Sequence, residues 1–185
     1  MLTRDDAWKL LNEHVHDDVL LKHSRETEVI MRALARRLGQ DEALWAITGL
    51  LHDLDFETTK ETPAQHTLRT VELLAERGFP PEAIQAVKAH NWDNLGIERV
   101  GAFDYALAAA ESITGILVAT ALVQPDKKLG SVKVSSIRKK LKTPAFARAV
   151  RREPIYDVEK TGLTLDEFIA LALDALNAIH DELGL

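Results

Sequence analysis

Apolar residues recur along most of the chain three or four positions apart, which is the spacing of one face of an α-helix. Ile30, Met31, Leu34 and Leu38 are a typical run. Capping residues, prolines and glycines mark where such segments begin and end. The pattern predicts helices over residues 3–14, 19–38, 41–53, 63–78, 81–90, 103–123 and 164–183.

The sequence gives no reason to expect a sheet. Alternation of apolar and polar residues is limited to Val132-Lys133-Val134, which is too short for a strand. The sequence also contains no internal repeat and no low-complexity linker. We therefore expect an all-α, single-domain helical bundle over residues 1–185, with a core at about 20–123 and a C-terminal helical extension at about 130–185.

The composition is that of a folded domain without thiol chemistry. The chain has 185 residues, of which 46% are hydrophobic, 28% are charged and none is cysteine. A chain of this length can bury a sizeable core. Without cysteine, any metal must be held by histidines and carboxylates. The formal net charge of −6 argues against unspecific coating of nucleic acid.

We expect neither a signal peptide nor a membrane-spanning segment in this sequence. Met1–Asp6 is polar and acidic, unlike the basic head of a signal peptide. The longest apolar stretch, Ala106–Val123, is interrupted by Glu111, and the uninterrupted part is too short to span a bilayer. We expect a buried helix there, and a cytoplasmic protein without a membrane partner.

The charges are unevenly distributed along the chain. Residues 127–152 hold ten Lys and Arg residues and no acidic residue, although the whole chain is acidic. Two interpretations explain this segment equally well. It is either a solvated face that balances the charge of the acidic remainder, or a binding site for phosphate or another polyanion. The sequence leaves both interpretations open.

Several histidines fall on helix faces that are otherwise apolar. His23, His52 and His90 are each in register with buried-type residues, and the same holds for Glu111; His66 is less clear. A lone buried carboxylate is penalised by several kcal/mol, and no Lys or Arg lies between Arg99 and Lys127. A protonated Glu111 with a hydrogen bond is one solution. Three inward histidines together with Asp53 favour the other, a metal ion.

The sharpest pair is His52-Asp53. Adjacent residues in a helix point about 100° apart, so both can bind one ion only if the helix ends there. The apolar pattern does stop at Leu54-Asp55-Phe56. Ligation by histidine and carboxylate suits Fe, Mn, Co, Ni or Zn, whereas Ca²⁺ and Mg²⁺ prefer oxygen ligands alone.

The order of these residues, from His23 through His52-Asp53 to the acidic residue 111, resembles the HD superfamily of metal-dependent phosphohydrolases. The resemblance is wider than the dipeptide and covers about Leu20 to Leu185. It is closest to a branch of small, stand-alone hydrolases. The segments that carry it are LKHS (21–24), TGLLHDLDFE (48–57), PAQH (63–66), AHN (89–91), AAESITG (109–115) and the stretch 134–150.

The resemblance implies an all-helical bundle with one or two divalent transition metal ions at its centre. Carried over by position, His23, His52, Asp53 and the residue at 111 would hold the first ion. His66 and His90 would hold a second one bridged by Asp53, or would contact the substrate phosphate. Two departures stand out. Residue 111 is Glu where the family usually has Asp. Asp55-Phe56 also replaces the Gly and Lys of the cyclic-di-GMP phosphodiesterase branch, so we do not infer that substrate.

The function expected from this resemblance is hydrolysis of a phosphoester of a nucleotide or another phosphorylated small molecule by a metal-activated water. Asp53 would orient the water and accept its proton, and Asp55 would act as a second base or hold a histidine in place. Lys127, Lys128 and Lys133 would neutralise substrate phosphates. Two alternatives remain: a non-catalytic metal- or nucleotide-binding HD module, and a purely structural helical protein. No specific nucleic-acid partner is expected, and the sequence does not predict an oligomeric state.

Overall fold

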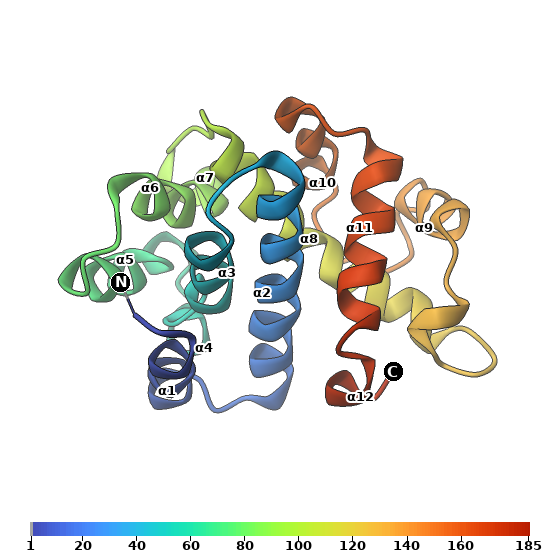
Figure 1. Cartoon of the computed structure of the whole chain (residues 1–185), viewed down its shortest axis with the longest axis horizontal. Helices are drawn as coiled ribbons and strands as arrows, with labels where there is room; N and C mark the ends of the chain where they lie inside the picture. Colours follow the sequence, from blue (N-terminus) through green and yellow to red (C-terminus); the bar gives the residue numbers. More distant parts are fainter. Residues whose placement is uncertain (1) are drawn as a thin grey trace.

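The computed structural model describes residues 2–185, and every regular element in that range is helical (Figure 1). The all-α prediction is therefore confirmed. The longer helices are α1 (Arg4–His14), α2 (Asp18–Leu38), α3 (Glu42–Leu51), α5 (Leu68–Glu76), α6 (Pro81–His90), α8 (Ala102–Leu122), α9 (Val134–Leu141) and α11 (Leu165–Asn177). Short helical turns connect them: α4 (Phe56–Thr59), η1 (Pro63–Gln65), α7 (Trp92–Leu95), η2 (Leu129–Ser131), α10 (Glu153–Tyr156), η3 (Asp157–Thr161) and α12 (His180–Leu183).

Helices α2 and α3 form a tightly packed antiparallel pair at the centre of the fold. The Asp17 side chain caps the start of α2, and Gly39 ends that helix in the left-handed region at φ 68°. Gly49 of α3 lies where a Cβ atom would come within 2.9 Å of Met31 Cγ and 3.0 Å of Thr27 O. Glycine at this position lets the two backbones approach closely, so that residues at the end of α3 lie against α2.

Helix α8 crosses behind α2 and α11 and contacts α2, α6, α9 and α10 (Figure 1). It is the one described helix that is long and apolar enough to cross a membrane, and 67% of its most apolar window is buried inside the fold. That burial is what the sequence predicted for the stretch around Glu111. Gly115 lies in the middle of the helix, and a Cβ atom added there would come within 2.7 Å of Val150 Cγ2. Helix α8 therefore also packs tightly against the basic segment, residues 127–152.

The predicted helix over 63–78 is wrong in its first third. Its beginning is the 3-10 turn η1, after which His66 is extended at φ −61° and ψ 137°. Thr67 then takes the left-handed conformation at φ 77°, and α5 starts only at Leu68. A threonine rarely adopts this conformation. Backbone N–H groups freed by the break are bound by Asp55, which the apolar pattern gave no means to foresee.

The last predicted helix also differs from the structure. Thr164 and Glu167 do form a capping box, as expected. The helix ends at Asn177 instead of Leu183, however, and the separate turn α12 follows. α12 lies beside the start of α2, where Lys22 Nζ donates a 2.9 Å hydrogen bond to the Leu183 carbonyl. The C-terminal residues thereby help to wall the cavity described next.

Candidate metal centre

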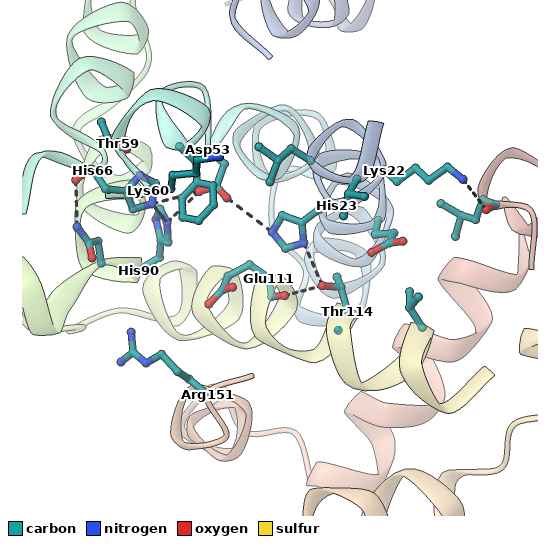
Figure 2. Close-up of a pocket in the computed structure, with 18 of the residues that line it drawn as sticks. Lys22, His23, Asp53, Thr59, Lys60, His66, His90, Glu111, Thr114 and Arg151 are labelled. Carbon is teal, nitrogen blue, oxygen red and sulfur yellow. Dashed lines mark hydrogen bonds and ion pairs between the residues drawn. The ribbon is translucent and has the colours of Figure 1, made fainter. Parts of the chain in front are cut away.

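A cavity of about 880 Å³ opens between α2, α8 and the C-terminal residues, and we refer to it as the central pocket. Five of the six residues predicted to bind metal line this pocket with their side chains (Figure 2). His23 comes from α2 and Glu111 from α8. Asp53 follows the end of α3, His66 follows η1, and His90 ends α6.

His52 and His90 are oriented by the ends of their own helices. The Nδ1–H of His52 donates a 2.8 Å hydrogen bond to the carbonyl of Gly49, and that of His90 donates a 2.6 Å hydrogen bond to the carbonyl of Val87. Carbonyls in the last turn of a helix have no partner within the helix, so they are free to accept. The prediction that α3 ends at His52-Asp53 is confirmed and has this consequence: both rings present Nε2 to the pocket floor.

His23 and His66 reach the same orientation through side chains from elsewhere in the chain. The Nδ1–H of His23 donates to Thr114 Oγ1 at 3.0 Å, and the Thr114 hydroxyl donates to the Glu111 carbonyl at 2.7 Å. The Nδ1–H of His66 donates to Asp55 Oδ1 at 2.9 Å. In each ring the hydrogen bond at Nδ1 selects the tautomer that leaves Nε2 with a free lone pair.

The four Nε2 atoms converge in two pairs. His23 Nε2 and His52 Nε2 lie 3.3 Å apart, and His66 Nε2 and His90 Nε2 lie 3.0 Å apart. Two lone pairs at this distance repel unless a proton or a cation lies between them. Two imidazole nitrogens bound at about 2.0–2.1 Å to one ion would lie roughly 3 Å apart, so both pairs have the spacing of ligands to a shared metal.

Asp53 belongs to both pairs. Its Oδ1 lies 3.2 Å from His90 Nε2, 3.3 Å from His66 Nε2 and 3.5 Å from His52 Nε2, and its Oδ2 lies 3.8 Å from His23 Nε2. Within residues 2–185, Oδ1 is buried and accepts no hydrogen bond. The result is two triads that share one carboxylate: the first triad, His23–His52–Asp53, and the second triad, Asp53–His66–His90.

The electrostatics of the triads match this arrangement. Burial lowers the pKa of His52 to about 3, against the opposing pull of Asp53, so this ring is neutral. Burial alone would raise the pKa of Asp53, but the surrounding His52, His66 and His90 outweigh it and hold that pKa well below its usual range. Burial also lowers the pKa of His66, yet Asp53 and Asp55 prevail and raise it to about 9. Without metal, His66 therefore holds a proton where a cation would fit.

These donors fit a divalent transition metal. Four imidazole Nε2 atoms and one ionised carboxylate converge, and each ring is held by a further hydrogen bond, as is usual for metal ligands. The fit rests on Asp53 Oδ1, which is buried and, without metal, depends on the proton of His66 to balance its charge.

Glu111 lines the central pocket, but its carboxylate lies outside both triads. Oε1 accepts a hydrogen bond from the neighbouring Ser112 hydroxyl. Burial raises the pKa of Glu111, and His90 opposes this only in part. The role of Glu111 as a metal ligand stays a prediction.

Asp55 is present at the site in one of the two roles expected for it. Both of its carboxylate oxygens are occupied: Oδ1 accepts from His66 and from the Thr67 N–H, and Oδ2 accepts from the Thr70 N–H, with both backbone contacts at 3.0 Å. Asp55 holds His66 in place, and it is not among the residues that line the central pocket. It is thus a positioning residue.

The structure brings none of Lys127, Lys128 and Lys133 to the central pocket, and their expected contact with substrate stays a prediction. All three are exposed, and none lines the central pocket. Helix α8 continues along the pocket wall to Leu122, so residues that follow it are carried past the pocket. The cations at the pocket mouth are instead Lys22, Lys60 and Arg151.

Three residues that build the site were not among the predicted site residues, and only the first two carry a signal in the sequence. Thr114 follows Glu111 by three positions and therefore shares its helix face. Asn91 follows His90 directly, and its Nδ2 donates to the carbonyls of Pro63 and His66 at 2.9 and 3.0 Å. Arg151 is the one residue of the basic segment 127–152 at the pocket, and nothing in its local sequence distinguishes it from the other nine.

Comparison with known proteins agrees with this geometry. A family model described as "HD domain" matches residues 20–121. Ribonuclease Y of Latilactobacillus sakei is 29% identical over 167 residues, which is 89% of this chain and 32% of that protein. Ribonuclease Y of Aquifex aeolicus is 38% identical over 72 residues, 39% of this chain and 13% of that protein. The chain thus spans at most about a third of these relatives, and no solved structure matches it significantly.

Proposed function

Because this chain belongs to the HD domain family and carries its buried cluster of histidines and aspartate, we propose that it is a metal-dependent phosphohydrolase that cleaves a phosphoester of a nucleotide or another phosphorylated small molecule. The observation that carries the proposal is the convergence of four histidine Nε2 atoms on the buried Asp53 carboxylate, three of them near Oδ1 and one near Oδ2. The name of the relatives, Ribonuclease Y, supports it, because a ribonuclease hydrolyses phosphoesters.

The chain's own groups divide the work as follows. The first triad would hold one ion and the second triad another, the ions being Fe, Mn, Ni, Co or Zn. When bound, such an ion lowers the pKa of water to about 7 and stabilises negative charge on phosphate. Asp53, ionised by its histidine neighbours, orients the attacking water and accepts a hydrogen bond from it. Asp55 keeps the His66 ring in the tautomer that leaves Nε2 free.

Substrate binding falls to the pocket mouth. Lys60 and Arg151 line the pocket together with Asn91 and Asn94, and these polar side chains suit a phosphate group. Arg151 is held by Asp93 at 2.7 Å, so its guanidinium is positioned before substrate arrives. A volume of about 880 Å³ is within the range of pockets that enclose a whole small ligand, roughly 300–1,000 Å³.

One observation favours the alternative of a metal- or nucleotide-binding module without turnover. Glu111, the residue that departs from the family's usual aspartate, lies outside both triads. An ion held by three donors instead of four is bound more weakly, and a site that loses its ion retains only the pocket.

Hydrolysis of bis(p-nitrophenyl) phosphate and p-nitrophenyl phosphate separates these functions. Protein stripped with chelator is reloaded with Mn²⁺, Fe²⁺, Co²⁺, Ni²⁺ or Zn²⁺ in turn, and release of nitrophenol is followed. We expect turnover with at least one metal, and loss of it in Asp53→Asn but not in the exposed control Asp174→Asn. No turnover with any metal, despite measurable metal uptake, would replace the proposal with the binding module.

A further inference from the structure

The central pocket has two chemically different ends. The polar end contains the triads, Asn91 and Arg151. The other end, which we call the apolar arm, is walled by aliphatic side chains from the start of α2, the last turns of α8 and the C-terminal residues. These are Leu20, Val118, Leu122, Leu183 and Leu185. The aliphatic walls of the apolar arm have no part in hydrolysis at the triads. They suit the organic part of a substrate instead.

Glu26 lies within this apolar arm. It lines the pocket and is only 6% exposed. Throughout the described part of the chain, its carboxylate has neither a hydrogen bond nor an ion pair. The cation one turn away, Lys22, is turned aside because its Nζ donates to the Leu183 carbonyl, and Figure 2 shows it extending from α2 toward the C-terminal segment.

An unpartnered carboxylate among aliphatic side chains is strongly unfavourable, and the fold has not relieved it. Burial raises the pKa of Glu26 to about 7, and Lys22 offsets this only in part. Two other buried acids are bound by the chain itself: Asp55 by His66 and two backbone N–H groups, and Glu28 by Arg4 and Arg25. Glu26 differs from them in opening into a cavity, where a ligand can supply the hydrogen-bond donor that the chain does not.

Resting on the proposed function, we infer that the apolar arm holds the base of a nucleotide, and that Glu26 accepts a hydrogen bond from an amino group of that base. A planar base buries its faces against the aliphatic walls and brings N–H donors at its edge. Glu26 follows His23 by three residues on α2, about 4.5 Å along the helix axis. Because Glu26 lines the same pocket as the triads, one ligand that fills the pocket can place phosphate at the triads and its base at Glu26.

Equilibrium binding to metal-free protein tests the inference without hydrolysis. Isothermal titration in chelator compares two matched pairs of 5′-monophosphates, adenosine with purine riboside and guanosine with inosine, whose members differ by one amino group. Wild type, Glu26→Met, Glu26→Gln and the control Glu13→Gln, an exposed residue of α1, are titrated. Thermal melting of each variant establishes that it is folded.

We expect wild type and the control to bind the amino-bearing member of at least one pair about tenfold more tightly. Glu26→Met should abolish that preference, and Glu26→Gln should keep part of it because its amide oxygen still accepts. An unchanged preference in Glu26→Met, equal affinity within both pairs, or no binding of any of the four nucleotides would overturn the inference. Turnover of bis(p-nitrophenyl) phosphate by wild type decides the proposed function separately.

Discussion

The Nδ1–H of His66 donates a 2.9 Å hydrogen bond to Oδ1 of Asp55, which makes Asp55 the residue that sets the orientation of the second triad. An amide in place of this carboxylate weakens the hydrogen bond to His66 and leaves only one oxygen to accept from His66 and the two backbone N–H groups. We expect Asp55→Asn to weaken metal binding by about 10–100-fold, because partners of metal-bound histidines contribute that much. Competition with a fluorescent chelator measures the affinity. Unchanged affinity would mean that the backbone around Thr67 positions His66 without help.

Replacing Asp53 should affect both metal binding and the stability of the metal-free fold. In Asp53→Asn the shared carboxylate becomes neutral, so we expect both triads to lose their ions, giving less than about a tenth of the wild-type metal content. In chelator, the same variant should melt at a lower temperature than wild type, because His52, His66 and His90 stabilise the ionised carboxylate and hold its pKa below the usual range. Elemental analysis and melting curves measure both, with Asp174→Asn as the exposed control. A wild-type or higher melting temperature in chelator would contradict this account.

The pKa of His66 makes the metal-free protein sensitive to alkali. Its folded pKa of about 9 lies above the 6.5 of a free imidazole. The protonated ring therefore contributes stability that is complete below pH 6.5 and is lost as the pH rises through 9. By linkage the loss is at most about 3 kcal/mol in the free energy of unfolding.

Urea denaturation in chelator at several pH values between about 6 and 10 measures this loss. We expect wild type to lose stability over that range relative to His66→Gln, which has no proton to lose at this position. Comparing the two proteins cancels the titration of other groups, Glu26 among them. Parallel stability curves for both proteins would place the proton elsewhere in the cluster.

Gly49→Ala should disturb the first triad from a distance. Its methyl group would meet Met31 Cγ at 2.9 Å and the Thr27 carbonyl at 3.0 Å, so α3 must move away from α2. We expect a loss of about 1–3 kcal/mol in the free energy of unfolding, and weaker metal binding because His52 recedes from His23. Gly130→Ala, whose added methyl has no neighbour closer than 3.8 Å, is the matched control. Stability loss with unaltered metal affinity would show that the triad tolerates the shift.

Glu111→Gln decides whether the sixth predicted ligand binds metal. If Glu111 turns toward the first triad when an ion is present, the amide should lower metal affinity by about tenfold or more. Because burial raises the pKa of this carboxyl group, the neutral amide should leave the metal-free protein as stable as wild type or more so. Wild-type affinity in the variant would assign Glu111 to the pocket wall alone.

The long helices and the histidine positions were predictable because each depends on a periodic signal. α2 and α8 match their predicted limits to within one residue at most ends, since long amphipathic or apolar runs with clear caps leave little freedom. The same periodicity placed His23 and Glu111 on inward faces. The end of α3 at His52 was readable because the apolar pattern stops there.

The features that the sequence did not predict depend on contacts between segments distant in sequence. The left-handed Thr67 exists because Asp55, twelve residues earlier, binds its N–H. Lys127 and its neighbours were chosen by their closeness to Glu111 in the chain, but a helix of 21 residues carries them past the pocket. Arg151 reaches the pocket by the return of the chain after α9, which no local pattern encodes.

The sharing of Asp53 between both triads has a consequence for stoichiometry. If both triads were filled, four neutral imidazoles and one carboxylate would supply a single negative charge for two divalent ions. One ion would use most of that charge, so binding of the second would be opposed by repulsion unless an anion such as phosphate were bound as well. Occupancy of the second position should therefore rise with the concentration of phosphate or substrate, and a metal count made in plain buffer is a count of one state of a ligand-linked equilibrium.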